Sequence, residues 1–567
     1  MKKIINQPER VVREMIEGLV GIHAGWTRLQ GQNAILRADF IAAREQQVAL
    51  ISGGGSGHEP AHIGFVGAGM LSAAVAGEVF TSPSADAVLA AIKAIAGSPG
   101  VLLIVKNYTG DRLNFGLAAE MARAEGIHAA TVYVADDVAL AHVQDRAGRR
   151  GIAGTVLVHK MAGAAAAEGR SLPEVAMIAQ TAADAISTMG VSLSAGIVPA
   201  IGEPGFILGE NEIELGLGIH GEPGFRRMHV APADELVDQL LEPILMNEHL
   251  VPGDRVALLI NNLGATTTME LAIVARRALA ALRERELVVE RVYSGTFVSS
   301  LDTAGVSISL LKLDDSLLRW LDAPTSAPAW PHAALERPRV VEEHIPIQTT
   351  ARLRELPVQT ETGRRMKIIV EAACNALIDA EPQLTELDRA VGDGDLGITL
   401  SRGAKAVLQN MNTQAISNVA EALEEIAMTL QQSMGGSSGP LYGVFLLRAA
   451  NSLRGSSTLD AVDWAQAAVE ACEAIGEMGG AGAGDRTMLD ALIPFADTFR
   501  SGFLIGLNTP EALKAAVDAA ESGAQATATM FPKRGRSSYL AERALGHPDP
   551  GAIAAAIWLR AAVSRII

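Results

Sequence analysis

Three aspartates within eight residues form the most chemically informative stretch of this sequence. Asp388, Asp393 and Asp395 lie in LDRAVGDGDLGIT, where glycines flank the last two. Grouped carboxylates repel one another unless a cation lies among them, and Mg²⁺ prefers oxygen ligands that substrate phosphates complete. An EF-hand loop does not fit, because counting Asp393 as position 1 places Ala404 where that loop requires glutamate. The stretch therefore predicts a divalent-metal site beside a nucleotide polyphosphate, with a solvated turn as the alternative.

Three glycine-rich segments can bring backbone N–H groups close to an anion. They are SGGGSGHEP from Ser52, MGGSSGP from Met434 and GGAGAGD from Gly479. None is a Walker A loop, because Asp485 stands where that loop needs lysine, and none is a dinucleotide loop, because His58 replaces the third glycine. These segments argue against a P-loop kinase and a simple nicotinamide enzyme, and each is also compatible with an ordinary tight turn.

The side chains of His58, Asp111 and His220 suit chemistry on a small carbonyl compound. His58 lies in the first glycine-rich segment, Asp111 follows a buried apolar run in KNYTGD, and glycines surround His220 in GLGIHGEPG. Ligands bind at the carboxyl ends of strands in open α/β sheets, and a histidine nucleophile, an aspartate base and a second histidine can act together there. His62 is compatible with a structural or a functional role, and His159 is expected to be structural.

Arg536 lies late in the chain, in GRSSYL, and the segment GHPDPG follows it. A planar guanidinium can hold a transferring phosphate at two points. The segment therefore indicates a phosphate contact, with an exposed surface arginine as the alternative.

Short apolar runs alternate with alanine-rich stretches over the first 320 or so residues. Runs such as VALI at 48–51 and VLLIV at 101–105 have the length and β-branched content of buried strands. Segments such as 85–96 and 114–126 have helical length. This alternation predicts an α/β fold, in two lobes, with mixed or parallel sheets covered by helices.

The pattern changes after about residue 323, where six prolines occur within 35 residues. Such a segment is typical of an extended linker. Beyond residue 360 long amphipathic patterns dominate, which predicts an all-α bundle or barrel. The expected organisation is a first domain over 1–330, a proline-rich linker over 331–360 and a helical domain over 361–567.

Composition excludes several classes of protein. The net charge of −17 and the aromatic content of 4% argue against a nucleic-acid surface and against binding to an anionic membrane. The two cysteines, Cys374 and Cys472, lie far apart and are expected to be reduced. The N-terminus does not have the pattern of a signal peptide, so a cytoplasmic location is expected.

The motifs together resemble the single-chain ATP-dependent dihydroxyacetone kinase family over nearly the whole chain. The resemblance rests on GGGSGHEP, NYTGD, GIHGEPG, GDGDLG, MGGSSG and DRTMLD, which occur in the family's order. It implies a dihydroxyacetone-binding domain followed by an ATP-binding helical domain, and a role in glycerol metabolism.

The resemblance implies roles for residues of the first domain. His220 is similar to the histidine that holds the substrate carbonyl covalently as a hemiaminal. Asp111 is similar to the base that takes the proton of the attacking hydroxyl, and His58 to its acid–base helper. The substrate site would comprise Gly55, Ser56, Gly57, His58, Lys106, Asp111 and His220.

The resemblance also implies a nucleotide site in the helical domain. Asp388, Asp393 and Asp395 would bind two Mg²⁺ ions that bridge the ATP phosphates, and Arg536 would lie at the phosphoryl-transfer centre. The remaining nucleotide contacts would be Leu396, Gly397, Ile398, Thr399, Ser437, Ser438, Gly479, Met488, Asp549, Pro550 and Gly551.

The expected reaction is phosphorylation of dihydroxyacetone by ATP. The resemblance also implies that the protein is a homodimer, as family members are. The alternatives are a kinase of erythrulose or glyceraldehyde, a phosphotransferase-system-coupled subunit, a nucleotide-cyclising lyase and a regulatory binding protein.

Overall fold

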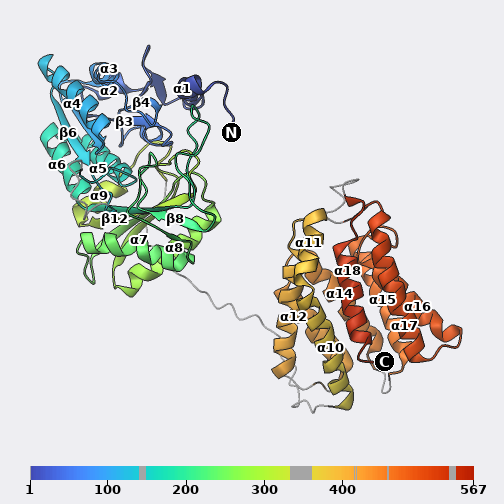
Figure 1. Cartoon of the computed structure of the whole chain (residues 1–567). Helices are drawn as coiled ribbons and strands as arrows, with labels where there is room; N and C mark the ends of the chain where they lie inside the picture. Colours follow the sequence, from blue (N-terminus) through green and yellow to red (C-terminus); the bar gives the residue numbers. More distant parts are fainter. Residues whose placement is uncertain are drawn as a thin grey trace. The chain divides into compact units, whose positions relative to one another are not determined.

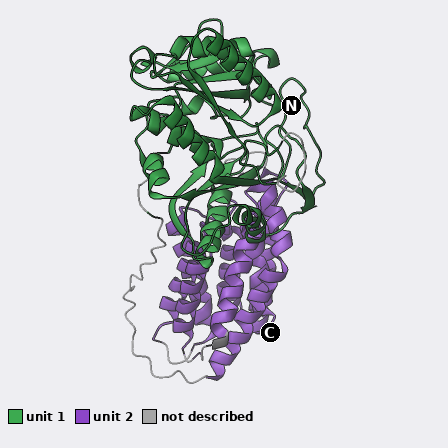
Figure 2. Ribbon diagram, turned by 90° about the vertical axis from the view of Figure 1, so that its left-hand side faces the viewer, with its two compact units in different colours: residues 1–344 green, residues 345–567 purple. Residues whose placement is uncertain are grey.

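The computed structural model describes residues 2–139, 148–331, 337, 360–413, 416, 418–455, 459–534 and 544–567. The chain forms two compact units, Met1–His344 and Ile345–Ile567 (Figure 2). Each unit is described separately below. Within the described ranges, no helix combines the length and apolar character needed to cross a membrane.

The first unit contains a six-stranded mixed sheet, part of which is labelled in Figure 1. Its strand order is β1-β2-β4-β3-β5-β6. Its central strand β3 pairs in parallel with β4 and β5, whereas β1, β2 and β4 pair antiparallel. The strands are β1 (Trp26–Arg28), β2 (Ala34–Arg37), β3 (Ala49–Ser56), β4 (Ala73–Val79), β5 (Val101–Lys106) and β6 (Ala129–Val134).

A second six-stranded sheet follows in the same unit, in the order β11-β10-β12-β7-β8-β9. Only the β10–β11 pair is parallel; the other pairs are antiparallel. Its strands are β7 (Ile186–Ser192), β8 (Glu212–Leu215), β9 (Arg226–His229), β10 (Arg255–Asn262), β11 (Val288–Gly295) and β12 (Gly305–Leu313).

Helices cover both sheets. The α-helices of this unit are α1 (Val11–Ile22), α2 (Phe40–Ala43), α3 (Ala85–Ile95), α4 (Thr109–Ala124), α5 (Thr155–Ala167), α6 (Leu172–Asp184), α7 (Ala233–Asn247), α8 (Thr268–Glu284) and α9 (Asp315–Asp322). Local sequence sets their ends: Thr267 and Glu270, for example, form a capping box at the start of α8.

Alternation along β5 shows how the layers are built. Leu103 and Val105 face the core shared with α3 and α4, whereas Leu102 and Ile104 face the core shared with α5. That second core also contains side chains of β10 and β12, so α5 packs between the two sheets and is buried along nearly its whole length. Helices α7 and α8 cover the far face of the second sheet.

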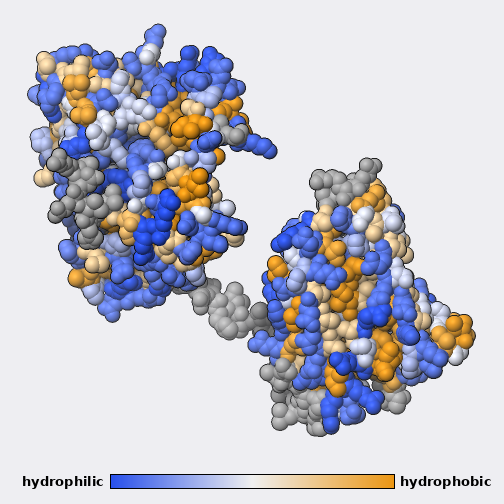
Figure 3. Space-filling model, viewed as in Figure 1, coloured by the Kyte–Doolittle hydropathy of each residue, from blue (hydrophilic) through white to orange (hydrophobic). Residues whose placement is uncertain are grey.

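The second unit is helical throughout its described residues. Its α-helices are α10 (Glu361–Asp379), α11 (Glu381–Val391), α12 (Leu396–Thr413), α13 (Val419–Ser433), α14 (Ser438–Leu453), α15 (Ala461–Gly479), α16 (Leu489–Leu504), α17 (Thr509–Ala526) and α18 (Pro550–Val563). One apolar core joins α11, α12, α15, α16, α17 and α18, and a second joins α10, α12, α13 and α14. Apolar and polar residues are interspersed over the surface of each unit in the view of Figure 3.

The predicted fold class, an α/β domain with mixed sheets followed by an all-α domain, is confirmed. Two boundaries were wrong in detail. The strand expected to end at residue 51 continues through the glycines to Ser56, and the helix expected from residue 114 begins at Thr109. Most of the predicted linker, 331–360, lies outside the described residues.

Candidate active site

His58 lies just beyond the buried central strand β3, and its ring is fully buried. Nδ1 of His58 lies 2.8 Å from the carbonyl oxygen of Ser299. Because a carbonyl oxygen only accepts hydrogen bonds, Nδ1 carries the proton and donates it. The other nitrogen, Nε2, therefore has a free lone pair, and it is buried with no hydrogen-bond partner within the described ranges.

His220 has the same tautomer for a different reason. Its Nδ1 lies 2.7 Å from Oε1 of Glu222, and its backbone N–H donates to Oε2 of the same carboxylate at 3.0 Å. The proton therefore belongs on Nδ1, which leaves Nε2 of His220 with a lone pair. The His58 and His220 rings meet edge to face, with their centroids 4.8 Å apart.

Aromatic side chains enclose the two histidines. Phe80 stacks on His58 with a centroid distance of 5.1 Å and meets the ring of His220 at 5.3 Å. Tyr108 meets His220 at 4.6 Å. This group of four rings, His58, Phe80, Tyr108 and His220, is called the aromatic chamber below.

Lys106 and Asp111 lie on two consecutive elements. Lys106 ends β5 and Asp111 lies in the first turn of α4, and both are buried. A Cβ placed on Gly54 would lie 3.1 Å from Nζ of Lys106 and 3.5 Å from Oδ2 of Asp111, so both charged ends border the same glycine. Ser82 donates a hydrogen bond from its hydroxyl to Oδ1 of Asp111, whereas Nζ of Lys106 has no hydrogen-bond partner in the part of the chain that the structure describes.

Burial controls the charges around the chamber. Desolvation, followed by the charges of Lys106 and His220, holds the pKa of His58 well below its usual value of 6.5. Burial also lowers the pKa of Lys106, although the carboxylates of Asp111 and Glu222 oppose that shift. For Glu222, burial acts to raise the pKa, but the hydrogen bonds from His220 outweigh it and hold the pKa at about 2.

Residues 52–56 of the first glycine-rich segment belong to strand β3, and close neighbours explain why the segment contains glycines. A Cβ on Gly53 would lie 2.2 Å from the carbonyl oxygen of Val75, and one on Gly55 would lie 2.5 Å from the backbone nitrogen of Thr81. A Cβ on Gly57 would lie 2.9 Å from Cε1 of Phe80. Strand β4 and the turn after it therefore require glycine here, which corrects the expectation of a loop.

Two further histidines form a buried pair behind this site. Nδ1 of His62 lies 3.0 Å from Nε2 of His159, and none of the described residues forms a hydrogen bond with the remaining, buried ring nitrogens of the pair. Burial and the charge of Lys106 lower both pKa values, that of His159 to about 3. Sequence reasoning left His62 open and missed the pair, because 97 residues separate its members.

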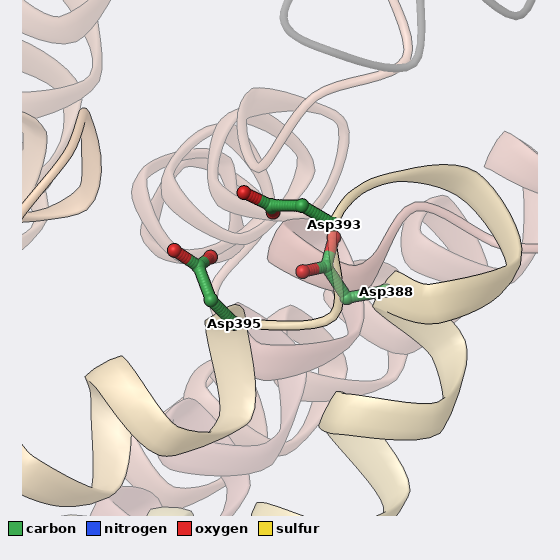
Figure 4. Close-up of side chains that lie close together, drawn as sticks. All are labelled: Asp388, Asp393 and Asp395. Atoms are coloured by element: carbon green, nitrogen blue, oxygen red, sulfur yellow. The ribbon is translucent and has the colours of Figure 1, made fainter. Parts of the chain in front are cut away.

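Asp388, Asp393 and Asp395 come together in the helical unit, as expected from their spacing. Asp388 lies in the last turn of α11, and the other two lie in the turn before α12 (Figure 4). One carboxylate oxygen from each lies within 4.8 Å of the others, and Oδ2 of Asp388 accepts the backbone N–H of Leu396 at 3.1 Å. Figure 4 shows the three carboxylates directed to the same side of the turn. This set of hard oxygen donors fits Mg²⁺.

The other expected nucleotide residues lie at helix ends. Leu396, Gly397, Ile398 and Thr399 form the first turn of α12, and Ser437 and Ser438 begin α14. Backbone N–H groups at such ends can bind phosphate oxygens. Gly479 ends α15.

A second group joins Met488 to the start of α18. Met488 precedes α16, and Asp549 caps α18 by accepting the N–H of Ala552 at 2.8 Å. Pro550 is the first residue of α18, and a Cβ on Gly551 would lie 3.7 Å from Cβ of Met488. Burial raises the pKa of Asp549 to about 6.

Arg486 is a buried residue that sequence reasoning missed in this group. Its Nη2 donates to the carbonyl oxygens of Ala544 at 3.2 Å and His547 at 2.9 Å, which fastens the segment before α16 to the segment before α18. Its Nε and Nη1 are buried and have no hydrogen-bond partner among the described residues. Arg536 lies outside the described residues.

Family comparison agrees with this division. A model described as the Dak1 domain matches residues 17–329, and one described as the DAK2 domain matches residues 390–564. The fold and the sites thus define a kinase with two fused domains, one α/β and one helical. The chain belongs to the single-chain dihydroxyacetone kinase family.

Several relatives match over almost the full length. The triokinase/FMN cyclase of Homo sapiens is 43% identical over 99% of this chain and 98% of its own. Dihydroxyacetone kinase 2 of Saccharomyces cerevisiae is 36% identical over 97% of both chains. The dihydroxyacetone kinase of C. freundii, solved with AMP-PNP and Mg²⁺, is 36% identical over 99% of both chains, with a TM-score of 0.63.

Proposed function

We propose that this protein uses ATP to phosphorylate a terminal hydroxyl of dihydroxyacetone, giving dihydroxyacetone phosphate. The observation that carries the proposal is the hydrogen bond from His220 to Glu222, which frees Nε2 of His220 to act as a nucleophile beside His58. The similarity to triokinase and dihydroxyacetone kinases supports the same substrate class. Erythrulose and glyceraldehyde are the alternative acceptors.

His220 would bind the substrate covalently. Nε2 attacks the carbonyl carbon, the C–N bond forms, and the π electron pair moves to the carbonyl oxygen, which takes a proton from water. The ring gains positive charge, which the ionised Glu222 at Nδ1 offsets. Because glycerol has no carbonyl group, this step would select ketones and aldehydes against it.

Asp111 would then act as the base. It takes the proton of the terminal hydroxyl as that oxygen attacks the γ-phosphorus of ATP and ADP leaves. Nε2 of His58 has a lone pair, so it can accept a hydrogen bond from a substrate hydroxyl. Lys106 would contribute a donor at Nζ, and Gly55, Ser56 and Gly57 would line the same site.

The helical unit would supply the phosphoryl donor. When bound, two Mg²⁺ ions would neutralise the charge of the ATP phosphates. Asp388, Asp393 and Asp395 would hold these ions, and Arg536 would lie at the transfer centre. The nucleotide would contact Leu396, Gly397, Ile398, Thr399, Ser437, Ser438, Gly479, Met488, Asp549, Pro550 and Gly551.

We further propose that residues 1–330 bind the ketose, that 361–567 bind ATP, and that 331–360 connect them. A homodimer would let the ATP domain of one chain serve the substrate domain of another. The place of action would be the cytoplasm, in glycerol metabolism.

The deciding experiment measures ADP release with Mg·ATP in the presence of dihydroxyacetone, erythrulose, glyceraldehyde or glycerol. We expect release with a carbonyl substrate and none with glycerol. His220→Ala should abolish it, and Asp111→Ala should abolish transfer while ketone binding stays detectable. No release with any carbonyl compound would refute the kinase, and activity that required a phosphocarrier protein would favour a subunit of a phosphotransferase system.

A second candidate activity follows from one relative. The human protein is named triokinase/FMN cyclase, so the helical domain of this chain could also cyclise an FAD-type nucleotide. Incubating the full chain with FAD and a divalent metal, without ketone, tests this: formation of cyclic FMN supports the activity, and unchanged FAD refutes it.

A further inference from the structure

Phe80 has a backbone conformation that aromatic residues rarely adopt. It follows β4 directly, and its φ of 56° lies in the left-handed region. Its N–H donates to the carbonyl oxygen of Ser56 at 2.9 Å, which ties the turn to the end of β3. Such conformations gather at sites where the surrounding structure uses them, so the position of this side chain calls for an explanation.

The unusual backbone brings one ring against both histidines. Phe80 lies nearly parallel to His58, at 20° and 5.1 Å, and nearly perpendicular to His220, at 85° and 5.3 Å. Tyr108 has a ring contact with His220 but none with His58 among the described residues. The ring of Phe80 therefore contacts the rings of both histidines.

The neighbouring glycines are fitted to this ring. A Cβ on Gly57 would lie 2.9 Å from Cε1 of Phe80, and a Cβ on Gly55 would lie 2.7 Å from its Cα. Any side chain at these positions would displace Phe80 from the histidines. Phe80 is itself only half-buried.

We propose that Phe80 is a specificity-determining residue that limits the length of the ketose accepted at His220. The inference rests on the proposed function. The ring offers no hydrogen-bonding group, so an additional CHOH unit held against it would lose the hydrogen bonds that its hydroxyl makes in water. A three-carbon ketone avoids this loss, whereas a four-carbon ketose such as erythrulose incurs it.

The experiment compares kcat/KM for dihydroxyacetone and erythrulose in the full chain and in Phe80→Ala, Phe80→Leu and Phe80→Tyr variants. Removing the ring should shift the ratio towards erythrulose by at least about fivefold in the alanine variant, since one substituent in such a pocket changes selectivity by roughly 10-fold or more. The tyrosine variant keeps the ring but adds a hydroxyl that can form a hydrogen bond, so it should also shift the ratio towards erythrulose, by less than the alanine variant.

Phe115→Leu is the matched control. Phe115 is fully buried on α4, near Gly53, and has no ring contact with either histidine among the described residues. It should lower the unfolding temperature without changing the ratio. If Phe80→Ala does not fold, Phe80→Leu decides the question.

Two outcomes separate this inference from the proposed function. An active chain whose selectivity ratio stays within twofold in the folded Phe80 variants would refute the role of Phe80 and leave the kinase intact. A chain inactive with every ketone would refute the proposed function, and the inference with it.

Discussion

Glu222 holds His220 through two hydrogen bonds, one to Nδ1 of the ring at 2.7 Å and one to the backbone N–H at 3.0 Å. The two residues are only two positions apart, so the carboxylate fixes both the ring and the turn that carries it. Because the pKa of Glu222 is held at about 2, the carboxylate stays ionised throughout the neutral and mildly acidic range. While it is ionised, it accepts the hydrogen bond from Nδ1 of His220, which places the proton of the neutral ring on Nδ1 and the lone pair on Nε2.

Glu222→Gln should lower kcat/KM for the ketone by about 100-fold or more. The amide nitrogen of glutamine can donate to Nδ1, which moves the ring proton to Nε2 and removes the nucleophilic lone pair. Steady-state kinetics at saturating Mg·ATP measure this effect. Glu203→Gln, an exposed change in the same segment, should have no effect, and an equally active Glu222 variant would contradict the role of the carboxylate.

Asp393→Asn should weaken divalent-metal binding by at least about tenfold, because it removes one of three charged ligands. Mn²⁺ titration followed by electron paramagnetic resonance reports this without any turnover. Glu386→Gln is the control, since Glu386 is an exposed carboxylate on α11, the helix that carries Asp388, and pairs with Arg389. Equal Mn²⁺ affinity in both variants would show that the aspartate cluster is not a metal site.

Arg486→Met should raise the KM for ATP by roughly tenfold, the cost expected when charge-assisted hydrogen bonds are lost. The change frees the segment at 544–547 from the segment before α16 and leaves the ketone site untouched. Arg500→Met is the matched control, because it removes a guanidinium group from an exposed position of α16. A KM for ATP that stays unchanged while stability falls would restrict Arg486 to a structural role.

The first unit should lose stability as the pH falls below about 6.5. His58, His62 and His159 are buried with lowered pKa values, so the unfolded chain binds protons at these positions in a range where the folded chain does not. Each contributes about 1.4 kcal/mol of unfolding free energy per pH unit, lost progressively on acidification.

Thermal unfolding of the full chain from pH 7.5 to 5.5 tests this dependence. His62→Asn should reduce the number of protons bound on unfolding by about one, and so weaken the pH dependence of stability. His128→Asn, at an exposed position, should leave that dependence unchanged. An equal pH dependence of the unfolding midpoint in the unmodified chain and in His62→Asn would contradict the neutral state of His62.

The features that could be predicted from the sequence are mostly those in which the residues lie close together along the chain. The three aspartates lie within eight residues, so their convergence follows from the chain itself. The predicted end of β3 was wrong because glycines are more typical of turns than of strands. In β3 the glycines are required because the backbone of β4 lies very close to them. The start of α4 was also wrong, because Gly110 in the first turn of this helix is not typical of a helix. The observed start places Asp111 at the N-terminus of α4.

Contacts between distant residues could not be predicted in this way. His58 meets the Ser299 carbonyl 241 residues further along, and nothing in the sequence near Phe80 indicates that its ring joins two histidines. Arg486 lies in the DRTMLD motif, but its contacts could not be predicted, because its partners are backbone carbonyls, which have no residue type to recognise.

The crowded glycines of β3 also affect how mutational data on this protein should be interpreted. Replacing Gly53 or Gly55 would inactivate the protein by forcing β4 or the turn at Phe80 away, whether or not either glycine touches a ligand. A saturation screen would therefore score these positions as intolerant alongside His220 and Asp111. At Gly53 and Gly55, intolerance to substitution reflects how closely two backbone segments approach. Only assays that separate protein abundance from turnover can distinguish these glycines from His220 and Asp111.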